Sequence, residues 1–236
     1  MDNYNPYGFQ DSQAVYSDTL MTRVMRKVYF KMFFALLVTA ATAFYVAMDG
    51  SFIQLMAAHP MAYWGLFIVE LAMVFSISGL IHKISSTVAT LLFYGYSIIN
   101  GLVLSMIFLV YDLGSIGQTF LITAGVFGAM TIYGYVTKRS LARLGSFLFM
   151  ALIGLIICSV VNMFLRSSGM DWLISFAGVA IFIGLTAWDT QKIKEWAAQD
   201  AGANAGKIAT IGALSLYLDF VNLFLYLLRF FGNSRN

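Results

Sequence analysis

The chain has 236 residues, of which 60% are hydrophobic and only 11% are charged. Soluble domains carry about 25% charged residues, so the composition excludes an ordinary soluble protein and indicates an integral membrane protein. The net charge of +3 forms no basic stripe of the kind that binds nucleic acid, because Lys and Arg cluster between apolar segments. The single cysteine, Cys158, lies inside an apolar run and excludes an intramolecular disulfide or a cysteine-based metal cluster.

Residues 1–28 are polar and aromatic, and they lack the apolar core of a signal peptide. They predict a cytoplasmic polar tail that ends in the basic residues Arg23, Arg26 and Lys27. Residues 29–231 are predicted to form one transmembrane domain, and residues 232–236 a short C-terminal tail.

Seven apolar segments make up the transmembrane domain. Each approaches or exceeds the ~20 residues that a helix needs to cross the hydrocarbon core of a bilayer. Unpaired backbone groups cannot face lipid, so the sequence predicts an all-α, polytopic membrane protein that is a seven-transmembrane-helix bundle. The predicted spans are 29–48, 61–81, 88–111, 119–136, 144–165, 172 to about 196, and 208–231.

The distribution of Lys and Arg predicts the orientation of the bundle. With the N-terminus in the cytoplasm, eleven of the 14 Lys and Arg residues fall on the cytoplasmic side and three on the other. Basic residues are retained on the cytoplasmic side of membrane proteins. The sequence therefore predicts a cytoplasmic N-terminus and an outside C-terminus, and an even number of spans would destroy the asymmetry.

Polar residues recur along the last span at alternating spacings of three and four, which places them on one face of a helix. A carboxylate at bilayer depth costs roughly 2.5–3.5 kcal/mol or more, so it faces a bundle interior, a wet cavity or a partner charge. We therefore expect this last helix to lie at the centre of the bundle. The face, called here the polar seam, consists of Gly212, Ser215, Asp219, Asn222, Tyr226 and Arg229.

Asp189 in the sixth span is the predicted partner of Asp219. Hydropathy falls directly after Asp189, but Trp196 is a natural interface anchor, so the helix is expected to continue to it. Asp189 then lies about 10 Å inside Trp196, and Asp219 lies about 16 Å inside Ile208 on the same membrane side. The two depths differ by only about 6 Å, which side chains and modest tilts can close.

Two carboxylates in a dry site cannot both ionise comfortably, so such a pair tends to share a proton and responds to pH. When deprotonated, Asp189 and Asp219 also supply the oxygen ligands that hard ions such as Ca²⁺ prefer. The alternative is that Asp189 caps its helix or pairs with a lysine at the membrane rim.

The remaining polar residues leave several roles open. Glu70 in the second span completes an ion path, hydrogen-bonds across helices, or is protonated. Asn100 and Asn222 are interpreted first as hydrogen-bond partners between helices. Neither His59 nor His82 belongs to a zinc-binding motif, and no nucleophile elbow is present, so we expect neither an enzyme nor a catalytic residue.

Two runs near the C-terminus are similar to a known family. Asp189-Thr-Gln-Lys-Ile, followed by Leu216-Tyr-Leu-Asp219-Phe-Val-Asn222, resembles the C-terminal signature of the Bax inhibitor motif family in its bacterial branch. The resemblance implies a seven-helix fold with a central last helix, in a bacterial inner (plasma) membrane protein that permits a pH-sensitive Ca²⁺ leak. It also implies that Asp189 and Asp219 are the pH sensor.

The resemblance leaves one residue unplaced. Members of the family can carry a basic residue in the second helix that latches onto the aspartate pair. His82 and Lys83 are the nearest candidates here, and both lie at the cytoplasmic rim.

The first hypothesis is a passive cation channel or transporter, with Ca²⁺ favoured, gated by the proton that Asp189 and Asp219 share. Its partners are the lipid bilayer, Ca²⁺ and protons, and it requires no cofactor. Ser215 and Asn222 either line the ion route or pack the bundle. A second hypothesis is a noncatalytic membrane protein that regulates another complex. A third, an intramembrane aspartyl protease, is disfavoured because the Gly-x-Gly-Asp and Pro-Ala-Leu elements of that class are absent.

Overall fold

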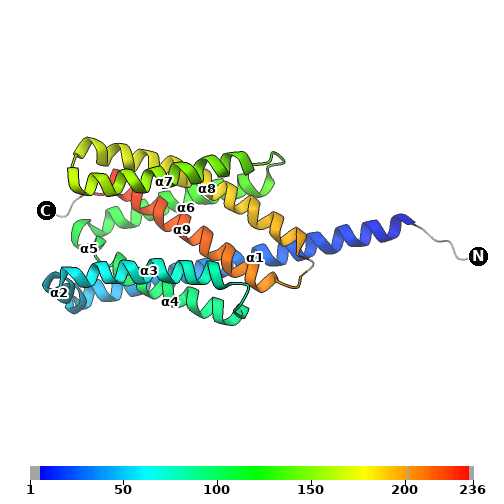
Figure 1. Cartoon of the computed structure of the whole chain (residues 1–236), viewed down its shortest axis with the longest axis horizontal. Coiled ribbons are helices and arrows are strands. Elements are labelled where there is room, and N and C mark those ends of the chain that lie inside the picture. The colour runs from blue at the N-terminus through cyan, green and yellow to red at the C-terminus, as the bar shows by residue number, and fades with distance from the viewer. Residues whose placement is uncertain (1–5, 201, 234–236) are drawn as a thin grey trace, which may run out of the picture.

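The computed structural model describes residues 6–200 and 202–233, and these residues are almost wholly helical (Figure 1). The helices of this described part are α1 (Pro6–Asp49), α2 (Ser51–Ala58), α3 (Pro60–Leu80), α4 (Ser86–Leu104), α5 (Ile107–Val110), α6 (Leu113–Val136), α7 (Ala142–Leu165), α8 (Ser168–Gln199) and α9 (Ala205–Phe231).

Seven of the helical segments are long and apolar enough to cross a membrane, which confirms the all-α fold and the predicted number of spans. The sixth span is confirmed to continue well past Asp189, because α8 ends only at Gln199. The short helix α2 was not predicted, and it connects the first span to the second.

The helix that carries the first span begins before residue 29, where the predicted span starts. α1 begins at Pro6, and its stretch that is apolar enough to cross a membrane lies within Thr19–Asp49. Val24, Met25 and Val28 are buried in the main hydrophobic core, at the spacing of one helix face. One face of the helix at the end of the predicted tail thus packs in the core, while residues 1–5 of that tail lie outside the described part of the chain.

Helix α9 lies at the centre of the bundle, as predicted. In its most apolar stretch 67% of the residues are buried, against 11–44% in the other six spans. It packs against α1, α4, α6 and α8, and Figure 1 shows it running between the α3–α4 pair and the α7–α8 pair. A central position explains how this helix can carry polar side chains without exposing them to lipid.

Two glycines let α8 approach its neighbours closely just before Asp189. A Cβ atom on Gly134 of α6 would collide with the backbone carbonyl of Ala187, and one on Gly145 of α7 would overlap the indole ring of Trp188. Small residues permit this kind of close contact between transmembrane helices. Residues on either side of α8 therefore fix the height and rotation of Asp189.

The start of α6 is capped by Asp112, which joins it to the end of the chain. The Asp112 carboxylate accepts hydrogen bonds from the backbone N–H of Ser115 at 2.9 Å and from its hydroxyl at 2.7 Å. The Ser115 hydroxyl in turn accepts from the backbone N–H of Asn233 at 3.0 Å. The predicted C-terminal tail is therefore attached to α6 at residue 233, and residues 234–236 lie outside the described part.

The Asp112 cap predicts a loss of stability in acid. Hydrogen bonds from the Ser115 hydroxyl and backbone hold the pKa of Asp112 below its usual value. A carboxyl group with a lower pKa in the folded state stabilises the fold above its unfolded pKa, and that contribution disappears as the pH falls through the folded pKa. We expect Asp112→Asn to lower the Tm of the purified protein near neutral pH, by a difference that narrows below about pH 4. A Tm difference that stays constant between neutral and acidic pH would contradict this.

Candidate functional site

The structure buries both aspartates on adjacent helices. Asp189 on α8 is 8% exposed and Asp219 on α9 is 4% exposed. Ser215, one turn before Asp219 on α9, lies beside the Asp189 carboxylate. The two carboxyl groups lie close enough to interact electrostatically. The structure therefore brings together Asp189, Ser215 and Asp219. We call the two aspartates the aspartate pair.

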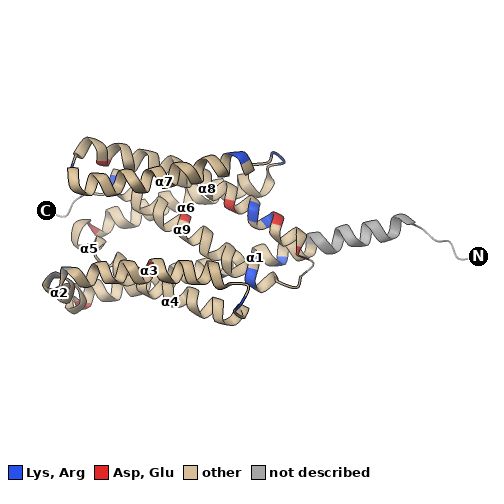
Figure 2. Ribbon diagram, in the orientation of Figure 1, with Lys and Arg blue, Asp and Glu red and all other residues tan. Residues whose placement is uncertain are grey.

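The neighbourhood of Ser215 places Asp189 relative to Asp219. Asp189 lies beside Ser215, and Ser215 precedes Asp219 by four residues, or about 6 Å along a helix axis. Figure 2 shows that Lys and Arg residues collect at the end of the bundle where α8 ends and α9 begins. Asp189 is thus the member of the pair nearer to this end. We call this end the basic end.

The charge that reaches both aspartates is that of Lys192. Its ammonium group acts electrostatically on Asp189 and on Asp219. It lies 4.5 Å from the ring centroid of Trp188 and 4.7 Å from that of Trp196, so two indole faces hold it in place. A lysine three residues after Asp189 on the same helix therefore supplies a positive charge to both aspartates.

His82 and Lys83 do not approach the pair. Both side chains are exposed in the turn that follows α3. The backbone carbonyl of His82 accepts a hydrogen bond from the ammonium group of Lys207 at 3.2 Å. The structure therefore places the two latch candidates at the surface of the basic end, on a loop that contacts the start of α9.

Asp219 carries an uncompensated polar atom. Its Oδ2 is buried and has no hydrogen-bond partner among the residues that the structure describes. A buried acceptor without a partner costs about 1–3 kcal/mol, so such an atom in a folded protein needs an explanation. Among the described residues no group of three His, Cys, Asp or Glu side chains could hold a metal ion.

Glu70 and Asn100 belong to a second polar cluster, which links four helices. The Asn100 amide on α4 donates to the Glu70 carboxylate on α3 at 2.8 Å, and the Tyr217 hydroxyl on α9 donates to the Asn100 carbonyl oxygen at 3.0 Å. The Thr39 hydroxyl on α1 lies 2.6 Å from the Tyr217 hydroxyl and also donates to the Ser97 carbonyl at 2.9 Å. We call this cluster the Asn100 network.

The Asn100 network and the aspartate pair lie on different sides of α9. Tyr217 and Asp219 are two residues apart, which is a rotation of about 200° around a helix. Glu70 is accordingly hydrogen-bonded across helices, one of the three roles left open for it. The sequence missed Tyr217 and Thr39, because Tyr217 lies off the polar seam and a lone threonine in an apolar span gives no signal.

The part of the polar seam that follows Asp219 makes different contacts from the aspartate pair. The Asn222 amide donates to the Leu218 carbonyl of its own helix at 2.8 Å. The Tyr226 ring lies against Gly178 and stacks on Phe182, with centroids 5.8 Å apart. Arg229 reaches a polar cavity of about 480 Å³ at the end of the bundle opposite the basic end. The seam therefore leads from the aspartate pair, past an aromatic contact, to an outer cavity.

Lys31 forms a third interior contact, which the sequence analysis did not foresee. It was counted among the basic residues of the rim, but its ammonium group donates to the hydroxyls of Thr90 and Thr210, each at 2.7 Å. The lysine thereby joins α1, α4 and α9. The two threonines lie in otherwise apolar helices, and only the three-dimensional arrangement shows that they share one cation.

Comparison with known proteins places this bundle among related sequences. A sequence model of the family described as "Inhibitor of apoptosis-promoting Bax1" matches residues 21–236. "Inner membrane protein YbhL" of Escherichia coli strain K12 is 48% identical over 214 residues, which cover 89% of this chain and 92% of that protein. An uncharacterized protein of Borreliella burgdorferi is 44% identical over 219 residues, covering 92% and 94% of the two chains.

Proposed function

This chain belongs to the Bax inhibitor family, and on that premise we propose that it is a pH-sensitive cation leak pathway with Ca²⁺ as the favoured ion. The observation that carries the proposal is the aspartate pair, in which Oδ2 of Asp219 is buried without a partner beside a second carboxyl group. A shared proton satisfies such a pair, and so does a cation, so proton and cation compete for one site.

The ligand set favours passage of the ion over permanent binding. Ca²⁺ takes six to eight oxygen ligands. The Asp189 and Asp219 carboxylates with Ser215 supply fewer, so a cation at this site keeps part of its water shell. A site that attracts a cation without enclosing it allows the ion to leave again, as conduction requires.

The arrangement suggests how pH controls the pathway. When both carboxyl groups are ionised, their repulsion pushes α8 and α9 apart, and a proton shared between them removes that repulsion. In this proposal the route follows the seam from the pair toward the cavity at Arg229, and the ring contact between Tyr226 and Phe182 is its gate. In this proposal deprotonation loosens the α8–α9 contact and opens the path.

The proposal includes a location. The relative named as an inner membrane protein supports a bacterial inner membrane. The basic end faces the cytoplasm under the positive-inside rule, which puts the N-terminus inside and the C-terminus outside. The protein acts without a cofactor and without a catalytic step.

Calcium flux into liposomes tests the function. The purified chain is reconstituted with a Ca²⁺-sensitive dye inside the vesicles, and the initial rate is measured over a series from acidic to alkaline pH. We expect the wild-type rate to rise several-fold with pH, and Asp189→Asn or Asp219→Asn to abolish this dependence. Glu195→Gln is the matched control, because it removes an exposed carboxylate from the same helix α8.

Each other result has a clear meaning. If both aspartate variants keep the wild-type flux and its pH response, the pair is not the sensor and the proposal is wrong. Suppose that vesicles with the wild-type protein take up Ca²⁺ no faster than empty vesicles, and that the double variant with Asp189→Asn and Asp219→Asn remains folded. The aspartates then only connect helices. That result would favour a noncatalytic regulatory protein. Cleavage of a transmembrane peptide that requires both aspartates would indicate an intramembrane protease instead.

A further inference from the structure

Gln191 on α8 binds the loop between α6 and α7 with its side chain. It lies two residues after Asp189 and is buried, with 7% of its surface exposed. Its carbonyl oxygen accepts a hydrogen bond from the backbone N–H of Leu141 at 2.7 Å, and its amide group donates to the backbone carbonyl of Arg139 at 2.9 Å. Both polar ends of this side chain are therefore bound to another segment of the chain. We call these two bonds the Gln191 clasp.

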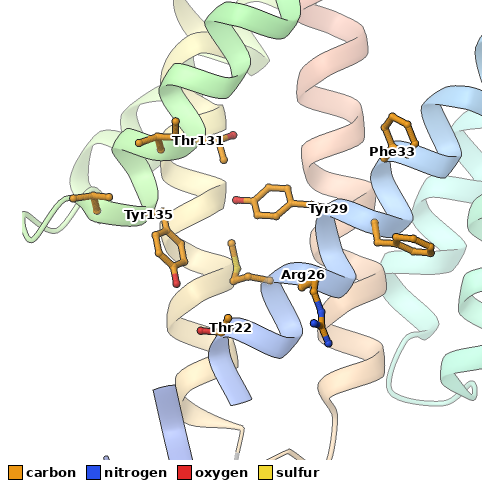
Figure 3. Close-up of a pocket in the computed structure, with 10 residues that line it drawn as sticks. Thr22, Arg26, Tyr29, Phe33, Thr131 and Tyr135 are labelled. Atoms are coloured by element: carbon orange, nitrogen blue, oxygen red, sulfur yellow. The ribbon is translucent and has the colours of Figure 1, made fainter. Parts of the chain in front are cut away.

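A second contact joins α8 to the end of α6. The ammonium group of Lys194 donates to the backbone carbonyl of Tyr135 at 2.8 Å and lies 5.0 Å from the centroid of its ring. Figure 3 shows Tyr135 near the end of α6, where it lines the groove between α1 and α6. Lys194 follows Gln191 by three residues, so the two side chains lie on nearly the same face of α8. That face is therefore attached at two points to residues 135–141.

Asp189 lies on the opposite face of α8. Gln191 follows it by two residues, which is a rotation of about 200° around a helix. Ala187 precedes Asp189 by two residues and shares the face of Gln191, and its carbonyl leaves no room for a Cβ atom on Gly134 of α6. The back of α8 thus rests on α6 at Ala187 and is bound to the loop at Gln191. Asp189 points the other way, toward α9.

The two kinds of contact restrict different movements of α8. The close contacts with Gly134 on α6 and Gly145 on α7 leave the helix no room to move toward α6 or α7 by itself. Rotation about its own axis remains, and such a rotation would carry Asp189 away from Asp219. Hydrogen bonds depend on direction as well as on distance, so the Gln191 clasp opposes this rotation.

Asp219 is held from behind in a corresponding way. Tyr217 precedes it by two residues on α9 and faces the Asn100 network, where its hydroxyl donates to Asn100 at 3.0 Å. Each aspartate therefore lies on the face of its helix opposite a side chain that hydrogen-bonds to a neighbouring segment. For α9 this side chain is Tyr217, and for α8 it is Gln191.

We propose that Gln191 is a positioning residue, which prevents rotation of α8, holds the Asp189 carboxylate toward Asp219 and thereby sets the affinity of the aspartate pair for its cation. The inference rests on the proposed function, because it concerns the cation site of that pathway. Residues that orient a metal ligand without touching the ion change affinity or activity by about 10–100-fold when they are replaced. Gln191→Met keeps the length of the side chain but removes its amide, so it releases the clasp and leaves both carboxylates in place.

Disulfide cross-linking tests the geometry without any flux. The full chain carries Asp189→Cys and Ser215→Cys, at two positions that lie beside one another on α8 and α9, together with Cys158→Ser. We expect copper phenanthroline to oxidise the two thiols to a disulfide, because neighbouring cysteines can adopt its geometry. Gln191→Met should slow this reaction several-fold. Asn162→Leu is the matched control, because the Asn162 amide binds the loop between α7 and α8 at the opposite end of α8.

The Ca²⁺ dependence of the flux tests the consequence for the cation site. In the liposome assay we expect Gln191→Met to raise the Ca²⁺ concentration that gives the half-maximal rate about tenfold, with little change in the maximal rate. Asn162→Leu should leave this concentration unchanged even where it lowers the Tm as much. A role in stability alone would reduce the amount of folded protein and hence the maximal rate, but it would not change the Ca²⁺ concentration.

A second variant applies if Gln191→Met does not fold. Gln191→Glu keeps an acceptor for the Leu141 N–H and loses the donor to Arg139, so it should slow the cross-linking less than Gln191→Met does. The proposal is overturned if the two cysteines do not cross-link when Gln191 is present, if Gln191→Met slows the reaction no more than Asn162→Leu, or if it keeps the wild-type Ca²⁺ dependence. If wild-type vesicles take up no Ca²⁺, the proposed function fails, and the cross-linking alone then supports or overturns the positioning role.

Discussion

Asn100→Leu is expected to destabilise the protein by about 3–5 kcal/mol, because it removes the central member of a buried network. Asn100 donates to Glu70 and accepts from Tyr217, so its loss leaves two partners without their hydrogen bonds at once. Each unsatisfied buried group costs about 1–3 kcal/mol, and a carboxyl group costs more than a neutral one. Equilibrium unfolding in mixed SDS and detergent micelles measures the difference.

Asn222→Leu is the matched control. Its amide donates only to the Leu218 carbonyl of its own helix, and the side chain is half-buried. We expect a change of about 1 kcal/mol or less, as for substitutions outside buried networks. An Asn100→Leu effect no larger than that of Asn222→Leu would show that the network does not hold α3, α4 and α9 together.

A double-mutant cycle of positions 70 and 100 identifies which group left without its hydrogen bond, the Glu70 carboxyl or the Tyr217 hydroxyl, accounts for the loss of stability. If the Glu70 carboxyl carries most of the cost, Glu70→Leu should recover part of the stability in the Asn100→Leu background. We expect a coupling of about 1–3 kcal/mol between the two positions, as for residues that share one hydrogen bond. Additive effects would instead assign the cost to Tyr217, whose hydroxyl is then left with Thr39 alone.

The sequence predicts the helices of this fold well, because hydropathy over 20 residues depends on composition and not on partners. It misses the buried face of α1 just before residue 29, where Val24, Met25 and Val28 alternate with Arg23, Arg26 and Lys27. The mean hydropathy of this stretch is low, although one face is buried. The three apolar residues recur at helical spacing, and that periodicity is the signal that could have found this buried face.

The site is predictable in part for a different reason. Depth along a helix follows from counting residues, so the pairing of Asp189 with Asp219 could be inferred. Rotation about the helix axis depends on which neighbours pack where, and the sequence alone does not contain it. The pairing of Asp189 with a rim lysine was therefore left open, although Lys192 lies three residues after it on one helix, and an acid and a base at that spacing are neighbours.

The buried network was hidden for the same reason. Glu70 could be recognised as costly, but its partner Asn100 lies thirty residues away and Tyr217 lies on a third helix. A polar side chain in an apolar helix indicates a hydrogen-bond partner on another helix, but the sequence does not identify that partner.

Asp219→Asn is expected to stabilise the protein while it removes the pH response. The substitution eliminates the repulsion between Asp189 and Asp219, and it replaces the unpartnered Oδ2 of Asp219 by a group that can donate to Asp189. We expect a gain of about 1–3 kcal/mol, which in a chain of this size raises the Tm by about 2–4 °C for each kcal/mol. The gain should be larger at alkaline pH, where both carboxyl groups of the wild type are ionised, than at acidic pH.

Asp189→Asn provides the comparison within the pair. Asp189 lies beside Ser215 and one turn from Lys192, so its charge is better compensated and its removal should stabilise less. Thermal unfolding in detergent without Ca²⁺, with Glu195→Gln as the control, measures all three variants. A lower Tm for Asp219→Asn would mean that the ionised carboxylate is satisfied in the folded protein, which contradicts competition between proton and cation. A buried carboxylate without a compensating partner lowers the stability of the protein, and a functional site can retain such a group. We therefore expect Asp219→Asn to raise the stability and to remove the pH dependence of the flux together.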